Sequence, residues 1–421
     1  MKLLRISCIF LLMTSLSVRA TDSSSSIEPL AQDQRVAHAL DWFESSSGWI
    51  TLQQIQLTEI PSPPFGESRR GELLRKLFES AGLTAHVDSA GNVIGERPGS
   101  GASAKDVVLL AAHLDTVFPA GTDVHVKRSG TRLQAPGIAD NGAGLAAIVA
   151  VARALSESKL NTGMTLLFAA DTGEEGEGNL RGIRKLVETY RSQLRAVIAV
   201  DGASTDYVTR QGLASRRIEV GISGPGGHSW SDFGAPNPIT ALARGIVRFS
   251  AIRLPDPPRS TFNFGVIEGG SSVNSIPNHV AVKVDLRSED QNELARMEDA
   301  LRNAIQEGID QEIAATRDGD PSLHSEFHLL GERPGGKLAD DSALLAAIRN
   351  VDRYLGNRVR FESSSTDANI PLSLGIPAIG IGGGGRGGGS HSLSEWYDPA
   401  ERSFGLKRIL LTALAVAGVQ P

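Results

Sequence analysis

Short apolar runs alternate with segments of helical pattern between residues 30 and 212, and polar residues follow the runs. The runs in DVVLLAAHLDTV, TGMTLLFAAD and RAVIAVDGA have the near-continuous apolar character of strands that are buried on both faces. Strands that alternate with helices predict an α/β fold, in which a largely parallel sheet lies between helices as the middle of three layers. Ligands bind to such sheets at the carboxyl ends of the strands, so the polar residues there are candidate site residues.

The pattern changes between residues 213 and 330. Here the segments predict a strand, a helix, two strands, a long helix and a further strand near HSEFHLL. This β-α-β-β-α-β order is that of a ferredoxin-like domain. Because the alternating α/β pattern resumes afterwards, the sequence predicts a large domain in two parts, 30–212 and 331–421, with the α+β domain of 213–330 inserted between them.

The first twenty residues contain Lys2 and Arg5, an apolar stretch and the small-residue pattern Val18-Arg19-Ala20. This arrangement is typical of a secretory signal peptide, since the apolar stretch is too short to span a bilayer. We therefore expect residues 1–20 to be removed and the mature protein to be periplasmic or secreted, without a membrane span. The Ser-rich segment 21–29 is expected to be a disordered linker.

Composition excludes several classes of protein. The only cysteine, Cys8, lies in the expected signal peptide, so the mature chain would have no disulfide and no thiolate ligand. A formal net charge of −6 and the absence of a Lys/Arg stripe argue against a nucleic-acid partner. Neither a G-x-S-x-G nor an H-E-x-x-H motif occurs, which disfavours a serine hydrolase and a single-zinc metalloprotease.

Residues with metal-ligand chemistry gather where strands of the large domain are expected to end. Taken singly, each has an ordinary structural explanation: adjacent glutamates are usually a solvated turn, and an aspartate before NGAGLAAI is typical of a helix N-cap. Together they suit two zinc ions, because so many like charges at one sheet edge are unfavourable without cations. The set comprises His113 and Asp115 in AAHLDTV, Asp140 in GIADNGAG, Glu174 and Glu175 in TGEEGEGNL, Asp201 in VAVDGA, and His391 in GGGSHSLSEW.

The motifs AAHLDTVF, GIADNGAG, TGEEGEGNL, VDGA and GGGSHS resemble, in this order, the metal-binding motifs of the M20 family of co-catalytic zinc exopeptidases and deacylases. That family includes peptidase T, glutamate carboxypeptidase, acetylornithine deacetylase and succinyl-diaminopimelate desuccinylase. The resemblance extends over nearly all of the expected mature chain. It implies that the large domain is catalytic and that the inserted domain is a lid through which a homodimer forms.

The resemblance also implies a dinuclear metal site, with two Zn²⁺ ions per subunit and Co²⁺ or Mn²⁺ as substitutes. His113 and Asp201 would bind one ion, and Glu175 and His391 would bind the other. Asp140 would bridge both ions, because two nearby cations need an anion between them to offset their repulsion.

Two acidic residues next to the ligands receive other roles from the resemblance. Glu174 would be the general base, which takes a proton from the metal-bridged water as it attacks the scissile carbonyl and then delivers it to the leaving amine. Asp115, two residues after His113, would orient the imidazole ring as a hydrogen-bond acceptor. Flanking glycines would let the turn bring both Glu174 and Glu175 close to the metals.

Three residues of the inserted domain match substrate-site positions of the family. His228 in GPGGHSW matches a lid histidine that stabilises the oxyanion, commonly in the active site of the other subunit. Arg287 in VDLRS would pair with a substrate carboxylate, for which a guanidinium has matching geometry. Asn274 in SSVNSIPN would be a polar substrate contact. For Arg287 and His228, a surface position without function stays open as an alternative.

Two positions bear on the backbone geometry of the metal site and on the class of substrate. Many family members have a second aspartate where this chain has Asn141, so the local backbone, often a cis peptide in the family, is left open. In the family, an aspartate at the position of Asp201 accompanies aminopeptidases and dipeptidases, whereas a glutamate accompanies carboxypeptidases and deacylases. We therefore expect a di- or tripeptidase that acts on short peptides.

Two alternatives remain. The first is a carboxypeptidase or an N-acyl amino-acid deacylase that uses the same metals. The second and more remote one is an exported metal-dependent binding protein without turnover. The presence of Glu174, which binds no metal in this scheme, argues against the second.

Overall fold

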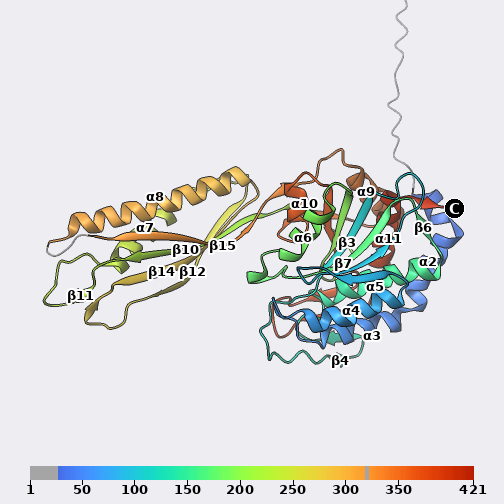
Figure 1. Ribbon diagram of the computed structural model, residues 1–421, viewed down its shortest axis with the longest axis horizontal. Coiled ribbons are helices and arrows are strands. Elements are labelled where there is room, and N and C mark those ends of the chain that lie inside the picture. Colours follow the sequence, from blue (N-terminus) through green and yellow to red (C-terminus); the bar gives the residue numbers. More distant parts are fainter. Residues whose placement is uncertain (1–26, 318–321) are drawn as a thin grey trace, which may run out of the picture.

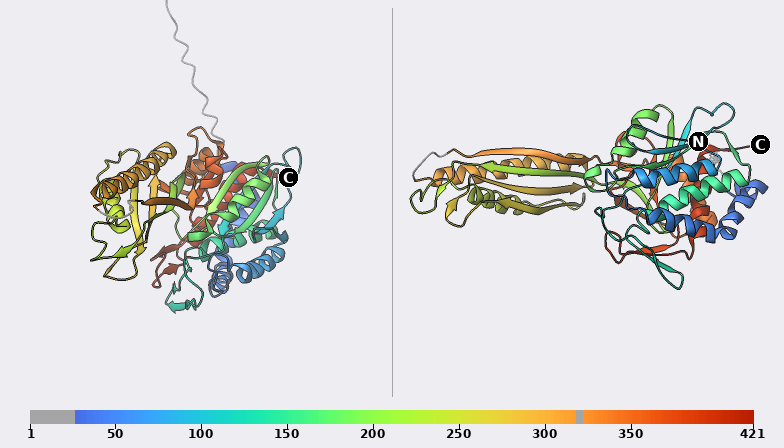
Figure 2. Two further views of the ribbon diagram at one scale, coloured as in Figure 1. Left: turned by 60° about the vertical axis from the view of Figure 1, so that its left-hand side comes forward. Right: turned by 60° about the horizontal axis from the view of Figure 1, so that its bottom comes forward.

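The computed structural model describes residues 27–317 and 322–421, which form a larger and a smaller body joined end to end (Figures 1 and 2). The expected signal peptide at 1–20 and residues 21–26 of the expected linker lie outside the described residues. For the end of that linker the prediction is wrong, since Ile27 is buried and helix α1 (Glu28–Gln32) begins directly after it. The apolar side chain of Ile27 packs into the core, and Pro29 in the first turn suits a helix start.

A nine-stranded mixed sheet forms the centre of the larger domain, with the order β1-β2-β7-β3-β8-β18-β9-β16 and with β17 beside β9. The strands β7, β3, β8 and β18 run parallel to one another, and β3 and β7 are buried along their whole length. This confirms the predicted α/β fold with a largely parallel central sheet. The bounds are β1 (Thr84–Val87), β2 (Val93–Arg97), β3 (Val107–His113), β7 (Thr165–Asp171), β8 (Leu194–Val200), β9 (Tyr207–Gly212), β16 (Gly336–Lys337), β17 (Arg360–Ser364) and β18 (Ala378–Ile381).

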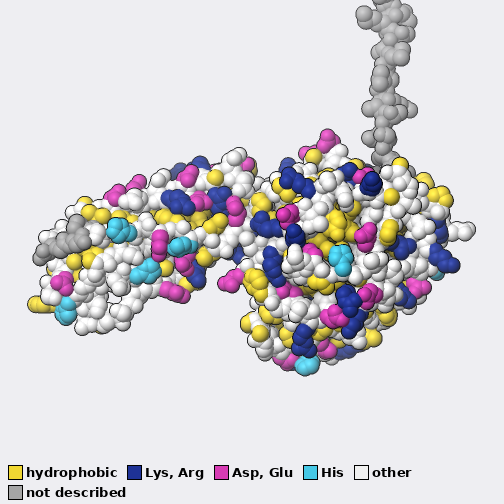
Figure 3. Space-filling model, viewed as in Figure 1, with side chains coloured by type: hydrophobic (Ala, Val, Ile, Leu, Met, Phe, Trp, Pro, Cys, Tyr) yellow, Lys and Arg dark blue, Asp and Glu magenta, His cyan; other side chains and the backbone are white. Residues whose placement is uncertain are grey.

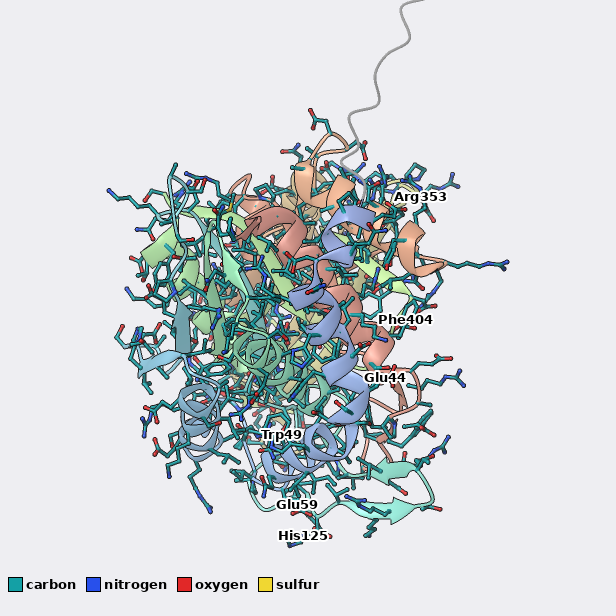
Figure 4. The ribbon with its side chains drawn as sticks, turned by 90° about the vertical axis from the view of Figure 1, so that its right-hand side faces the viewer. Glu44, Trp49, Glu59, His125, Arg353 and Phe404 are labelled. Atoms are coloured by element: carbon teal, nitrogen blue, oxygen red, sulfur yellow. The ribbon has the colours of Figure 1, made fainter. Side chains whose placement is uncertain are left out.

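Helices cover this sheet. Helix α5 is buried almost throughout because its sequence is apolar on every side, and α5 and α11 pack against β3 and against each other. On the side turned away from the smaller domain, α2 lies beside α11, where Glu44 pairs with Lys407 at 3.3 Å (Figure 4). The bounds are α2 (Gln34–Ser45), α3 (Ser47–Thr58), α4 (Ser68–Ser80), α5 (Gly142–Glu157), α6 (Arg181–Tyr190), α9 (Ala343–Leu355), α10 (Asn369–Ser373) and α11 (Arg402–Ala417).

A small four-stranded antiparallel sheet connects two loops of the larger domain that are distant in sequence. Its order is β19-β20-β5-β4, so β20 pairs with β5. This pairing places the chain before Asp140 beside the chain after His391. The bounds are β4 (Lys127–Ser129), β5 (Arg132–Gln134), β19 (Arg386–Gly388) and β20 (Trp396–Asp398); elsewhere β6 (Asn161–Thr162) pairs with β21 (Val419–Gln420).

The smaller domain has its own antiparallel sheet of order β12-β14-β10-β15 and its own apolar core. Its chain order β10-α7-β12-β14-α8-β15 is the predicted ferredoxin-like order. The helices α7 and α8 pack together against β10 and β14. The bounds are β10 (Ala214–Ser223), α7 (Pro238–Ser250), β12 (Ser260–Gly269), β14 (His279–Ser288), α8 (Gln291–Ala315) and β15 (His324–Arg333), and a ribbon of β11 (Gly227–His228) with β13 (Ser275–Ile276) extends the far end.

Two surface properties bear on partners. On the face shown in Figure 3, basic and acidic side chains are interspersed, without a continuous basic stripe. Among the helices of residues 27–317 and 322–421, none combines the length and the apolar character needed to cross a bilayer.

Candidate metal centre and active site

The carboxyl edge of the central sheet brings the five predicted metal ligands together. His113 is the last residue of β3, and Asp201 follows β8 directly. The other three come from loops: Asp140 precedes α5, Glu175 follows β7, and His391 lies between β19 and β20. Strand ends and loops therefore converge as the alternating sequence pattern predicted.

The distances between donor atoms divide the ligands into two sets that share Asp140. His113 Nε2 lies 3.1 Å from Asp140 Oδ1 and 3.5 Å from Asp201 Oδ1. His391 Nε2 lies 3.2 Å from Asp140 Oδ2 and 3.0 Å from Glu175 Oε1. Each set has ligand atoms within 4.8 Å of one another, and His113 also forms a third such set with Glu174 and Glu175. The two oxygens of Asp140 thus face two different imidazoles.

These residues fit divalent metal ions. They offer carboxylate oxygens and imidazole nitrogens, which are the donors that zinc and similar ions accept. Asp140 Oδ1 is buried and, within the described residues, makes no well-formed hydrogen bond, although His113 Nε2 is near. A buried carboxylate oxygen without a hydrogen bond is costly, and a cation would compensate it.

Electrostatics within the site point to the same need for positive charge. Burial disfavours a charged His113, but the nearby carboxylates of Asp140 and Asp201 outweigh burial and raise the pKa of His113 well above its ordinary value. Hydrogen bonds to Asp140 and Glu175 raise the pKa of His391 to about 10. Burial opposes ionisation of Asp140, yet the two histidines hold the pKa of this carboxyl below its ordinary value. The carboxylates of the site thus favour positive charge at both imidazoles.

Asp115 lies behind the site, but the predicted role of its carboxylate needs correction. The main-chain carbonyl oxygen of Asp115 lies 3.0 Å from His113 Nδ1, whereas the nearer carboxylate oxygen is 3.8 Å away. The carboxylate instead accepts the backbone N–H groups of Glu174 and Glu175, at 3.0 and 2.8 Å. The turn is buried, and an anion is the strongest acceptor for two such donors. Asp115 thus fixes the turn that carries both glutamates.

Glu174 is buried beside Arg333, a residue that the sequence analysis missed. Arg333 Nη1 donates to Glu174 Oε1 at 2.8 Å, and Arg333 Nη2 donates to the main-chain carbonyl of Glu174. Burial raises the pKa of Glu174 to about 8, although Arg333 opposes this shift. Arg333 is the last residue of β15 and stands before Pro334 and Gly335, a turn signal that marks the return to the larger domain.

A cavity of about 240 Å³ opens at this edge between the two domains. Arg287, the predicted partner of a substrate carboxylate, lines this cavity, and its Nε donates to Asp285 at 2.7 Å. Arg217 and Arg333 line it as well, so three guanidinium groups share the cavity with Glu174 and the carboxylate ligands. The remaining lining residues are Ser215, Ser364, Ser365, Thr366 and the metal-ligand candidate His391.

His228 and Asn274 lie elsewhere. Both belong to the ribbon region at the far end of the smaller domain, where β11 is drawn in Figure 1 and where Ser229 N donates to the carbonyl of Asn274 at 3.0 Å. Neither lines the cavity described above. The structure therefore does not bring these two predicted residues into the active site of their own chain, because the sheet of the smaller domain holds the ribbon away from it.

Asn141 links the bridging loop to the neighbouring strand. The Asp140–Asn141 peptide bond is cis. The Asn141 side chain, and not that of Asp140, caps α5, since its Oδ1 accepts from Gly144 N at 3.0 Å. Its amide nitrogen donates to Val200 O at 2.9 Å, a bond that an ionised aspartate cannot make. Asn141 therefore connects the loop of Asp140 with the strand that ends at Asp201.

Comparisons with known proteins agree with this arrangement. The model of peptidase family M20/M25/M40 matches residues 109–415. The acetylornithine deacetylase of Myxococcus xanthus is 27% identical over 361 residues, which are 80% of this chain and 89% of that protein.

Two solved structures share the fold. The aminopeptidase PepT of Bacillus cereus has a TM-score of 0.71 at 21% identity and covers 87% of this chain and 98% of its own. The YxeP protein of Bacillus subtilis, a dinuclear metal-binding peptidase from the M20 family, has a TM-score of 0.68 at 16% identity and covers 89% and 99%. Because the family model spans most of the chain and the metal-ligand residues converge, this chain belongs to peptidase family M20/M25/M40, the hydrolases that act on peptide or amide bonds.

Proposed function

We propose that the protein is a zinc-dependent exopeptidase that hydrolyses dipeptides or tripeptides. The observation that carries the proposal is the convergence of Glu174 with the two donor sets around Asp140 at one cavity. Two divalent ions held by these sets would supply Lewis-acid chemistry, which polarises a carbonyl oxygen and makes water a stronger acid. Co²⁺ or Mn²⁺ are the expected substitutes for Zn²⁺.

The protein's own residues account for the proton transfers. Glu174 accepts the proton of the attacking water and delivers it to the amine that leaves. Arg333 holds the Glu174 carboxylate at 2.8 Å, and Asp115 fixes the backbone on both sides of it. The base is thus held in place before substrate binds, so little reorganisation is needed during the reaction.

Arg217 and Arg287, which we call the basic wall of the cavity, favour a substrate with a free carboxylate. Arg287 and Arg217 face the same cavity as the metal ligands, and guanidinium groups bind carboxylates with two parallel hydrogen bonds. A dipeptide or tripeptide would present its terminal carboxylate to them. The aspartate at position 201 and the similarity to an aminopeptidase fold agree with a short-peptide substrate.

The second candidate is a carboxypeptidase or an N-acyl amino-acid deacylase. It is favoured because every acid that lines the cavity already has another role. Among its described lining residues, the acids are Asp140, Glu174, Glu175 and Asp201, all of which already belong to the metal centre or the base. An aminopeptidase needs an acceptor for the substrate's ammonium group, whereas an N-acyl substrate does not.

A substrate panel separates these candidates. Zinc-loaded protein is assayed for release of free amino acids from dipeptides, tripeptides, their N-acetylated forms and their C-terminal amides. Cleavage of peptides with a free amino terminus supports the di- or tripeptidase. Cleavage confined to N-blocked substrates transfers the assignment to the second candidate, and no metal-dependent cleavage of any of them contradicts both.

The substitution Arg287→Met tests the basic wall. Loss of a charge-assisted hydrogen bond worth about 1.5–3 kcal/mol should raise KM for substrates with a free carboxylate about 10- to 100-fold. For the matching amide substrates, kcat/KM should change little. The matched control is Lys283→Met on the same strand, whose side chain is about half exposed and does not line the cavity. An equal loss on carboxylate and amide substrates would contradict carboxylate recognition by Arg287.

The distant positions of His228 and Asn274 agree with action in a second copy of the chain. We therefore include in the proposal a homodimer formed through the smaller domain, in which these residues enter the partner's cavity. An inactive His228→Ala variant mixed with an inactive Glu174→Gln variant should regain activity, because one hybrid site then has both intact residues. Sedimentation of the protein as a monomer at assay concentrations would contradict the proposed homodimer.

A further inference from the structure

Glu395 is a fully buried carboxylate that joins the two loops carrying Asp140 and His391. It lies four residues after His391, and its side chain reaches across to the other loop. Its Oε2 accepts from Gly137 N at 3.0 Å. Its Oε1 accepts from Ala139 N and from Asp140 N, both at 2.8 Å. One side chain thus binds three backbone N–H groups of the chain segment that ends at the bridging ligand.

The main chain reinforces this connection. The carbonyl of Glu395 accepts from Ala135 N at 3.1 Å, and directly afterwards β20 pairs with β5. The N–H of Glu395 donates to Ser392 O at 3.1 Å, which closes the short turn that follows His391. Glu395 is therefore the point at which both ligand loops are held together.

A carboxylate is the side chain that this arrangement requires. The three donors are buried N–H groups, and each would lose its partner if Glu395 were replaced by an apolar residue. A glutamine has one acceptor oxygen, and its NH₂ group would face one or more of the same donors. The isosteric change therefore disturbs the loop of Asp140 while leaving the packing volume intact.

We infer that Glu395 is a positioning residue of the metal centre, which sets Asp140 and His391 at the spacing that two ions need. This inference rests on the proposed function, because it deepens the role of the same site. As a consequence, the two donor sets that share Asp140 both depend on Glu395, although Glu395 contacts no metal-ligand atom. Outer residues that orient metal ligands typically affect metal affinity about 10- to 100-fold.

The test is titration of metal-free Glu395→Gln with Co²⁺, followed by visible spectroscopy and by competition with a chelating dye. We expect affinity for Co²⁺ to fall about 10- to 100-fold and the spectrum of the bound ion to change, while circular dichroism shows a folded protein. Glu395→Asp, which keeps the charge but is one methylene shorter, should show a loss in the same direction. The matched control is Glu401→Gln, an exposed glutamate paired with Arg386, which should bind Co²⁺ as the unaltered protein does.

The possible outcomes distinguish a failure of this inference from a failure of the proposed metal-dependent function. Unaltered Co²⁺ affinity and spectrum in a folded Glu395 variant would overturn the inference alone. If neither variant folds, Glu395 serves the fold as a whole, and its assignment to the metal centre is overturned. If the unaltered protein binds no Co²⁺, the metal centre itself is wrong and the inference falls with it.

Discussion

Glu174→Gln should bind two equivalents of Zn²⁺ like the unaltered protein and yet lose kcat by about 10²–10⁴-fold, the range expected for loss of a general base. A glutamine keeps the shape of the side chain and can still accept the hydrogen bond from Arg333 Nη1. It cannot accept the proton of the attacking water. Metal content by elemental analysis and kcat on the best substrate of the panel measure the two effects on the same sample.

The control for this variant lies in the same loop. Glu177 is exposed and lines no part of the cavity, so Glu177→Gln should keep both metal content and kcat. The third donor set, which joins His113, Glu174 and Glu175, gives the experiment a second use. If Glu174→Gln loses an ion along with its activity, Glu174 is a ligand and the assignment of the base is wrong.

The strand ends of the larger domain were predictable from sequence because local pattern determines them. Near-continuous apolar runs identify strands that are buried on both faces, and such strands end at one edge of a parallel sheet. His113 and Asp201 follow from this rule. Asp140, Glu175 and His391 were expected at strand ends as well, but they lie in loops. The resemblance to a family, through the order of the motifs, supplied their predicted roles as ligands.

The contacts that support the ligands were not predictable, because each joins segments far apart in the chain. Arg333 and Glu174 are separated by 159 positions, and Glu395 and Asp140 by 255. A pattern read along the sequence shows a charged residue in a loop in each case, and only the topology shows what it meets. The role of the Asp115 carboxylate was misjudged for a related reason, since sequence does not show that two buried N–H groups compete for it.

The positions of His228 and Asn274 show a different limit. Motif matching assigned His228 to stabilisation of the oxyanion and Asn274 to substrate contact, while the sheet of the smaller domain holds both far from the cavity of their own chain. For His228 the resemblance already implied action in the active site of the other subunit, whereas for Asn274 the motif alone does not show in which copy of the chain it acts. The mixing experiment with His228→Ala and Glu174→Gln addresses this question directly.

Asp140→Asn is expected to weaken metal binding itself, whereas Glu174→Gln should lower turnover and leave metal binding intact. An asparagine offers one oxygen where the aspartate offers two, so it cannot face both His113 Nε2 and His391 Nε2 with a ligand oxygen. It also removes the anion between two cations. The loss of affinity for the second ion should exceed the roughly 10- to 100-fold that is typical of residues that only support ligands.

Zinc affinity by competition with a chelating dye and metal content after dialysis measure this loss. The loop itself should stay in place, since Glu395 binds the backbone N–H of residue 140 and not its side chain. Asp123→Asn, at an exposed position outside the site, is the matched control and should keep both ions. If Asp140→Asn keeps two ions at unaltered affinity, the two donor sets do not share this residue. The bridging role of Asp140 is then wrong, whether or not the protein is a peptidase.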